Sequence, residues 1–186
     1  PFISSSKQSH IFSITNITKM LEVHFFKDGF HKEHSPMYHM YMTNYLVQLR
    51  SAGWLSDNSD LHALAEKAEE QASWYILPDQ TILPLGDSKP NYPLQSACLF
   101  KMNTDSEEQI SAPEGLYQHK DGGLAILSTH SEDGTSREYL AFNAQFHSRM
   151  HKHSDDLSLH YCVFGKQYLV DSGTYAYQYD TPERMY

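Results

Sequence analysis

The sequence has few cysteines, few basic residues and no long apolar run, and each shortage excludes a class of protein. Two cysteines, Cys98 and Cys162, in 186 residues give neither a disulfide framework nor the spacing of a zinc ribbon. Fourteen Lys and Arg against 23 Asp and Glu leave a net charge of −9. Nucleic acid is therefore not expected as the main ligand, because phosphates attract clustered cations. No apolar run approaches the roughly 18 residues of a membrane helix, so we expect no membrane span.

Histidine and tyrosine are abundant, with 12 and 13 copies. Both side chains can transfer protons or bind polar polymers, although we expect most of them to pack in the interior. An apolar share of 40% is that of a folded chain and excludes strong disorder. The length corresponds to one domain or to parts of two. The sequence gives no signal for the oligomeric state.

The two ends of the sequence have no features of a natural terminus. Pro1-Phe2-Ile3 lacks the basic region and cleavage pattern of a signal peptide, and the last six residues do not form a polar tail. We interpret the chain as a piece of a longer polypeptide.

The first half of the sequence has helical periodicity. Apolar residues recur at three- and four-residue steps over residues 12–25, and the run 37–49 is apolar enough for a largely buried helix. Residues 60–75 predict a third, more polar helix, with Ser59 or Asp60 as its N-cap.

The second half changes to short runs of strand type after a stretch rich in proline between residues 78 and 93. Glycine-containing turns separate the predicted strands, which are residues 116–119, 124–128, 138–143, 157–164 and 167–171. Helices followed by antiparallel strands predict an α+β chain with two packed units. We place a helical unit at residues 1–90 and a sheet or sandwich unit at residues 91–186.

Tyr38 is the first candidate for chemistry. Ser35 is a natural N-cap and Pro36 suits the first helical position, so Tyr38 is predicted to be the third residue of a helix. The free N–H groups and dipole of a first turn favour negative charge, and we expect the pKa of Tyr38 to lie below its ordinary value near 10. Protonated His34 and His39 could assist proton transfer. The alternative is that Tyr38 is only a core aromatic residue.

The second candidate is the His151-Lys152-His153 sequence, followed by Asp171. In an extended segment His151 and His153 would face the same side. Two imidazoles and a carboxylate are typical zinc ligands. The pattern is weak by itself, because two histidines in a surface loop often bind nothing.

His160 is a rival ligand. If Gly165-Lys166 is a two-residue hairpin loop, Phe164 pairs with Gln167, and His160 then lies opposite Asp171. His153 could still reach Asp171 if the preceding segment folds back.

Four stretches together resemble the heparinase II/III-like polysaccharide lyases. They occur in the order of that family and are residues 28–39, 83–88, 151–158 and 169–177. The resemblance implies the last helices of an α/α toroid, at residues 1–90, followed by the start of an antiparallel β-sandwich, at residues 91–186. The substrate cleft of that family lies between the two domains.

The implied activity is β-elimination on a polysaccharide that contains uronic acid. By resemblance, Tyr38 is the catalytic acid, or acid and base, and His151 assists or neutralises the substrate carboxylate. We add His34, His39 and Lys152 as substrate-binding residues. A cleft for a polyuronate should also concentrate cations, for which the candidates near Tyr38 are Lys32, Arg149 and Lys152.

The resemblance also implies a structural zinc ion, ligated by His153 and Asp171. A third histidine ligand is expected beyond Tyr186, and a substrate-binding Asn or His before Pro1. We therefore expect the chain to be nearly inactive by itself. Lyases of this kind are usually periplasmic or secreted, and the same location is expected here.

Two alternatives stay open. The first is a non-catalytic protein that binds acidic glycans or takes part in capsule or exopolysaccharide assembly on the same scaffold. The second is a structural sandwich stabilised by zinc.

Overall fold

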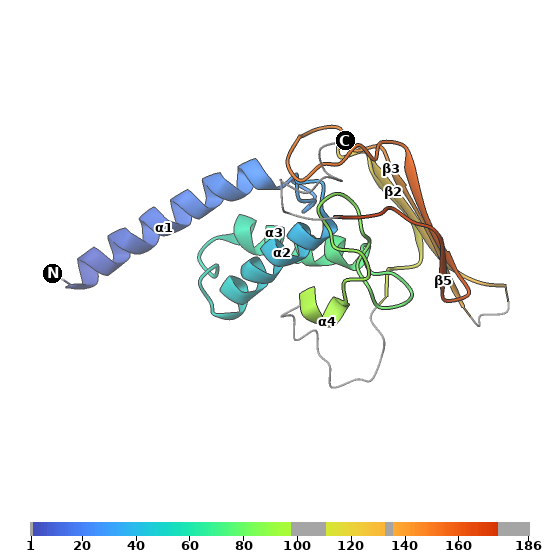
Figure 1. Cartoon of the computed structure of the whole chain (residues 1–186). Helices are drawn as coiled ribbons and strands as arrows, with labels where there is room; N and C mark the ends of the chain where they lie inside the picture. Colours follow the sequence, from blue (N-terminus) through green and yellow to red (C-terminus); the bar gives the residue numbers. More distant parts are fainter. Residues whose placement is uncertain (1, 98–110, 133–135, 175–186) are drawn as a thin grey trace.

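The computed structural model describes residues 2–97, 111–132 and 136–174, with side chains from residue 6 onward. Helices precede strands along the chain (Figure 1). The elements are α1 (Phe2–His24), α2 (Pro36–Ser51), α3 (Ser59–Ser73), α4 (Leu94–Ala97), β1 (Gly115–His119), β2 (Leu124–His130), β3 (Arg137–Asn143), β4 (Ser158–Val163) and β5 (Lys166–Leu169). The predicted α+β class is confirmed.

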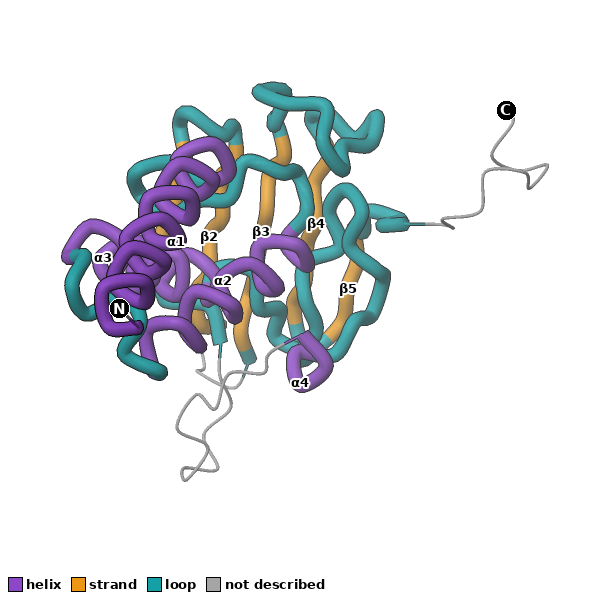
Figure 2. Tube along the Cα trace, turned by 90° about the vertical axis from the view of Figure 1, so that its left-hand side faces the viewer, coloured by secondary structure: helices purple, strands orange, loops and turns teal. Residues whose placement is uncertain are grey.

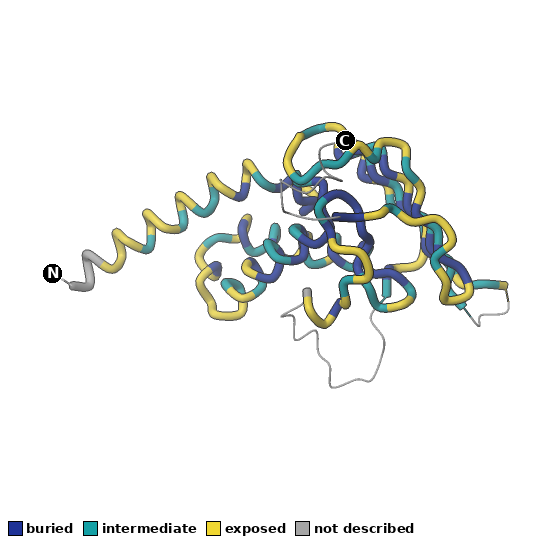
Figure 3. The backbone as a smooth tube through the Cα atoms, in the orientation of Figure 1, coloured by how far each residue is buried: buried dark blue, intermediate teal, exposed yellow. Residues whose placement is uncertain are grey.

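Helices α2 and α3 pack together, whereas α1 extends away from them toward the N-terminus (Figure 1). The C-terminal end of α1 is the part that is buried, because Leu21 and the following Phe25 join a buried cluster with Leu46 and Leu61. Most of the remaining α1 surface is exposed (Figure 3). Within the described ranges, no helix has both the length and the apolar character that a membrane span requires.

The helix starts follow from their capping residues. Ser35 caps α2 and Pro36 is its first residue, as predicted. The cap of α3 is Asn58, whose Oδ1 accepts a hydrogen bond of 3.0 Å from the backbone N–H of Leu61. The predicted caps Ser59 and Asp60 are therefore wrong, because both already lie inside the helix.

The five strands form one antiparallel sheet in the order β1-β2-β3-β4-β5, so every strand pairs with its neighbour in sequence. The helical layer covers one face of this sheet (Figure 2). On that face, Ile126 and Tyr139 share a core with Phe30, Met40 and other buried residues of the first half. Helices and sheet are thus held by a common core, and the boundary at residues 90 and 91 stays a prediction.

The opposite face of the sheet exposes apolar side chains. Leu116 pairs with Leu127, and Phe142 pairs with Leu159, and all four are 38–61% exposed. Apolar rows of this kind are typical of a sheet that packs against a second sheet. The sandwich and toroid assignments nevertheless stay predictions.

The predicted register of the last hairpin is wrong. Val163 pairs with Lys166, so the two-residue loop is Phe164-Gly165, and both have positive φ values, of 52° and 66°. Such angles are those of a type I′ turn, whose twist matches that of the flanking strands. A bulge then shifts the pairing, and the β4–β5 ladder ends at Leu169, before Asp171.

His160 is consequently not the partner of Asp171. It pairs with Ala141 of β3 and is 1% exposed. Its Nε2 lies 3.4 Å from the sulfur of Cys162, inside the core. The role of His160 as a rival ligand is therefore a wrong prediction.

Buried histidines predict a stability that depends on pH. Burial lowers the pKa of His34, His39 and His160 from 6.5 to about 4 each. When the pH lies between the ordinary pKa of 6.5 and the lowered pKa of about 4, the unfolded chain binds more protons than the folded chain. The free energy of unfolding should therefore fall as the pH drops from about 6.5 to about 4, by up to roughly 1.4 kcal/mol per pH unit for each histidine.

Urea denaturation at intervals between pH 7 and pH 5 measures this loss before most carboxylates titrate. A His160→Gln variant should show a shallower decline than the unmodified protein. Replacement of His62, whose side chain is 45% exposed, is the control. A flat profile over this range would contradict the assignment.

Candidate active site

The first turn of α2 is held by two serines from different segments. The Oγ of Ser35 accepts a hydrogen bond from the N–H of Tyr38, at 3.4 Å. The Oγ of Ser88 accepts from the N–H of Met37, at 3.0 Å, and lies 3.0 Å from the Oγ of Ser35. Tyr38 is therefore the third residue of the helix, as predicted, and its backbone is fixed from two sides.

The ring of Tyr38 stacks on the ring of His151, with centroids 3.9 Å apart and planes inclined by 18°. The two residues come from the start of α2 and from the loop before β4. Tyr38 is only partly buried, and the side chain of His151 is 25% exposed. Among the described residues, neither hydrophobic core cluster includes Tyr38, which argues against a purely core aromatic role.

Asp87 binds both histidines of the His151-Lys152-His153 sequence. Its Oδ2 accepts a hydrogen bond of 2.8 Å from Nδ1 of His151, and its Oδ1 accepts one of 2.8 Å from Nε2 of His153. Thr174 Oγ1 lies 3.4 Å from the same Oδ1. The two imidazoles thus meet at one carboxylate, although the segment is not extended as predicted, since His151 has a φ of 53°.

The charge of Asp87 is set by opposing effects. Burial by itself would raise the pKa of this carboxyl, but the hydrogen bonds from His151 and His153 bring the pKa below its ordinary value. An ionised carboxylate can only accept hydrogen bonds, so Nδ1 of His151 carries a proton. Sequence reasoning included Asp87 in a matching stretch but gave it no role. The signal available was an acid between Gly86 and Ser88.

Glu33 lies next to the other ring nitrogen of His151. Its Oε2 lies 3.4 Å from Nε2 of His151, and its side chain is 13% exposed. The imidazole is therefore placed between two carboxylates, those of Asp87 and Glu33. The sequence analysis assigned no role to Glu33.

The predicted zinc ligands are close to this cluster. His153 donates to Asp87, and Asp171 Oδ1 accepts a hydrogen bond of 2.8 Å from the N–H of Gly173. Burial raises the pKa of Asp171, while Gly173 and the nearby His153 partly offset this effect. His153 and Asp171 are of the donor types that zinc binds, so these residues fit such a group. Zinc ligation by His153 and Asp171 stays a prediction.

Two residues predicted to contact the substrate, His34 and His39, are buried. His39 is 1% exposed, its Nδ1 accepts from the N–H of His31, and its Nε2 donates to the carbonyl of Ala68. His34 is 3% exposed, and its Nε2 accepts from the N–H of Ser148. Both rings form hydrogen bonds inside the protein, and their role in substrate binding stays a prediction.

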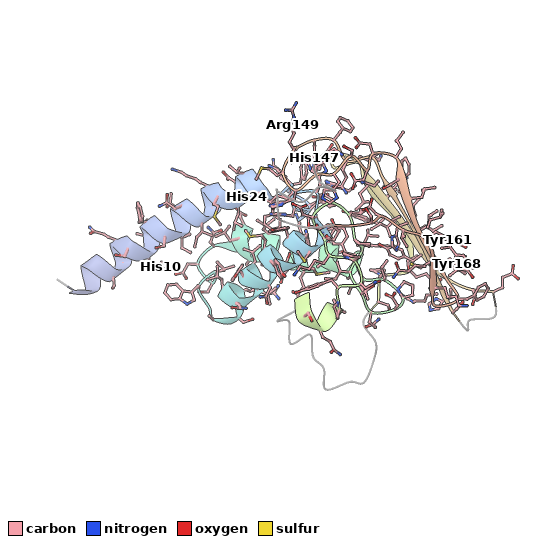
Figure 4. All side chains as sticks on the ribbon, viewed as in Figure 1. His10, His24, His147, Arg149, Tyr161 and Tyr168 are labelled. Carbon is pink, nitrogen blue, oxygen red and sulfur yellow. The ribbon has the colours of Figure 1, made fainter. Side chains whose placement is uncertain are left out.

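The predicted cations have other partners or point outward. Lys152 is paired with two acids, at 2.7 Å from Asp156 and 3.6 Å from Asp155. Lys32 donates to a backbone carbonyl of α1. Arg149 is exposed and projects away from the body of the protein (Figure 4). Near Tyr38, positive charge can therefore come from the imidazoles of the site itself.

A separate cavity of about 940 Å³ lies between α1 and α3. Its lining includes Leu21, Phe25 and Leu61, with Lys27 and Lys67. No residue of the Tyr38–His151 cluster lines it, so the cavity is not part of this candidate site.

The fold has counterparts among solved lyases. The heparan sulfate lyase HepC from Pedobacter heparinus aligns with 92% of this chain at 18% identity, with a TM-score of 0.71. A heparinase III structure aligns with 92% at 19% identity, also with a TM-score of 0.71. A HepC mutant aligns with 90% at 17% identity and a TM-score of 0.69. No protein-family model matches the sequence, and a comparison with curated proteins finds no match either.

These likenesses establish a fold and a distant structural relationship. The chain spans about 30% of the length of the lyase structures that it matches. At 17–19% identity, the similarity does not carry an activity with it. The function must be argued from the site.

Gly86 should be essential to the geometry of this site. It has a φ of 52°, and a Cβ there would lie 2.1 Å from the carbonyl oxygen of His34 and 2.4 Å from that of His151. We expect Gly86→Ala to lower the free energy of unfolding by more than about 2 kcal/mol, because backbone strain and two backbone clashes combine. Urea denaturation measures the loss.

Gly53→Ala is the matched control. Gly53 also has a positive φ, of 77°, but a Cβ there would meet nothing within 4 Å. Its substitution should cost only the conformational part, about 1 kcal/mol. Equal losses for the two variants would show that close packing around Gly86 is not what requires a glycine.

Proposed function

We propose that this chain carries part of the active site of a polysaccharide lyase that cleaves acidic, uronate-containing glycans by β-elimination. The observation that supports the proposal is the stacking of Tyr38 on His151, at 3.9 Å, with Asp87 hydrogen-bonded to the imidazole. A phenol and an oriented imidazole are suitable groups for moving protons at one sugar ring. The likeness of the fold to heparan sulfate lyases agrees with this chemistry.

The proposed reaction breaks two bonds and forms a double bond. A base removes the proton at C5 of the uronate, and the electron pair forms the C4=C5 bond as the C4–O bond breaks. The departing oxygen takes a proton from an acid. Tyr38 is the acid, or the acid and base, because its hydroxyl is the ionisable group of the partly exposed first turn of α2.

His151 assists at the same ring. Removal of the C5 proton places negative charge on the uronate carboxylate, which donors must offset. Asp87 holds a proton on Nδ1 of His151 and fixes the orientation of the ring. Glu33 limits the movement of the ring on its other side. Asp87 is therefore a positioning residue, since it acts through His151.

A structural zinc ion at His153 and Asp171 belongs to the same proposal. When bound, it would cross-link the loop before β4 to the segment after β5. A periplasmic or secreted location is also proposed, as expected for an enzyme that acts on polysaccharides outside the cell.

Tyr38→Phe tests the catalytic assignment. In the full-length protein, incubated with heparan sulfate, alginate and other polyuronates, we expect the variant to lose activity by a factor on the order of 10²–10⁴, because the transferable proton is removed. The ultraviolet absorbance of the unsaturated uronate product reports the rate. Tyr45→Phe is the control, since Tyr45 lies on the same helix and is 62% exposed.

Full activity in the Tyr38→Phe variant would remove Tyr38 from the mechanism. Binding of an acidic glycan by the unmodified protein, without any unsaturated product, would instead favour the non-catalytic alternative.

Asp87→Asn tests the positioning role. The amide can donate a hydrogen bond to Nδ1, which favours the wrong tautomer of His151. We expect kcat to fall on the order of 100-fold, with a shifted pH profile and little change in KM. An unchanged pH profile with an unchanged kcat would show that the orientation of His151 does not depend on this carboxylate.

A further inference from the structure

A second cluster of potential ligands lies where α1 ends. His24 is the last residue of α1, a short turn follows, and His31 and Glu33 come immediately after it. An antiparallel bridge between Phe25 and His31 closes this turn. One potential ligand atom from each of His24, His31 and Glu33 lies within 4.8 Å of the other two. In Figure 4, His24 marks the end of α1 that meets the body of the protein.

The rings of His24 and His31 are nearly parallel, inclined by 11° with centroids 6.0 Å apart. Nδ1 of His24 lies 3.7 Å from Oε1 of Glu33. A tetrahedral zinc with bonds of about 2.1 Å needs ligand atoms roughly 3.4 Å apart. The three atoms lie within 4.8 Å of one another, so no pair exceeds the required separation by more than about 1.4 Å.

His31 provides the observation that a turn alone does not explain. The residue is 1% exposed, and neither of its ring nitrogens has a hydrogen-bond partner within the described part of the chain. A buried polar group without a partner costs about 1–3 kcal/mol, so native proteins rarely leave one unsatisfied. A cation between His31, His24 and Glu33 would supply the missing partner.

The protonation of His31 agrees with this use. Burial, with smaller contributions from His39 and His24, lowers its pKa to about 2. The ring is therefore neutral at any physiological pH and keeps a lone pair available for a metal.

We propose that His24, His31 and Glu33 form a transition-metal site that binds zinc or a similar divalent ion. Two imidazole nitrogens and one carboxylate oxygen suit zinc and its neighbours, whereas calcium and magnesium prefer oxygen ligands alone. Three protein ligands leave one coordination position for water or another ligand. The side chain of His24 is 37% exposed, which gives the ion a route of entry.

The proposed ion would lie beside the candidate active site. Oε1 of Glu33 faces His24, while Oε2 lies 3.4 Å from Nε2 of His151. This site is distinct from the zinc position expected at His153 and Asp171, with which it shares no residue. It also does not depend on lyase activity, and its test does not use an activity.

The experiment is a titration of the metal-free protein with Co²⁺, followed by visible absorption, and with Zn²⁺, followed by calorimetry. We expect Co²⁺ to give the absorption bands of a tetrahedral or five-coordinate ion. We expect one zinc ion to bind at the proposed site, with an affinity that His24→Gln weakens at least tenfold. Glu33→Gln should weaken binding similarly. His10→Gln is the matched control, because His10 lies on the same helix, toward its other end (Figure 4).

His153→Gln separates the two metal positions and should keep the ion at the proposed site. Circular dichroism verifies that each variant is folded, and zinc should raise the Tm of His153→Gln more than that of a variant that carries both His24→Gln and His153→Gln. Absence of binding by the folded, unmodified protein would overturn the proposal. So would binding that His153→Gln abolishes and His24→Gln leaves unchanged.

Discussion

Asp87 accepts a hydrogen bond from each of two histidines while its neighbour Ser88 caps the first turn of α2, so one short loop connects both halves of the candidate site. Gly86 makes this connection possible, because it brings the loop against the backbone carbonyls of His34 and His151, where no Cβ fits. The segment after β5 is attached to the same loop, because the N–H of Thr174 donates a hydrogen bond to the carbonyl of Ser88. The loop of Gly86, Asp87 and Ser88 therefore holds both the first turn of α2, which carries Tyr38, and the imidazole of His151 that stacks on it.

The sequence predicted the features that depend on local chemistry. Ser35 and Pro36 gave the start of α2 and hence the position of Tyr38, because an N-cap and a first-turn proline act within a few residues. The strands were predicted close to their observed bounds for the same reason. The register of the last hairpin was predicted wrongly. Its one-residue shift and its bulge depend on how β4 and β5 pack, and not on the turn residues alone. The zinc position and the domain boundary stay predictions.

The roles of the histidines could not be read from the sequence, because they depend on burial by distant segments. His39 resembles a site residue along the chain, yet it is buried, and the backbone carbonyl of Ala68 on α3 accepts a hydrogen bond from its Nε2. Asp87 lies 64 residues from His151, so no spacing rule could pair them. The same holds for charge: Lys152 looked like a substrate contact, but Asp155 and Asp156 in its own loop neutralise it. The group in direct contact with Tyr38 is therefore the imidazole of His151.

Glu33 connects the two clusters at the end of α1 and at the start of α2. A carboxylate has two oxygens, and in this structure one faces His24 while the other faces His151. A cation bound through the first oxygen would offset part of the carboxylate charge, and the attraction between Glu33 and a protonated His151 would weaken. The imidazole would then be held mainly by Asp87, through the hydrogen bond at Nδ1. Occupancy of the metal site and the freedom of His151 at the candidate active site are consequently not independent, since both act on the same side chain.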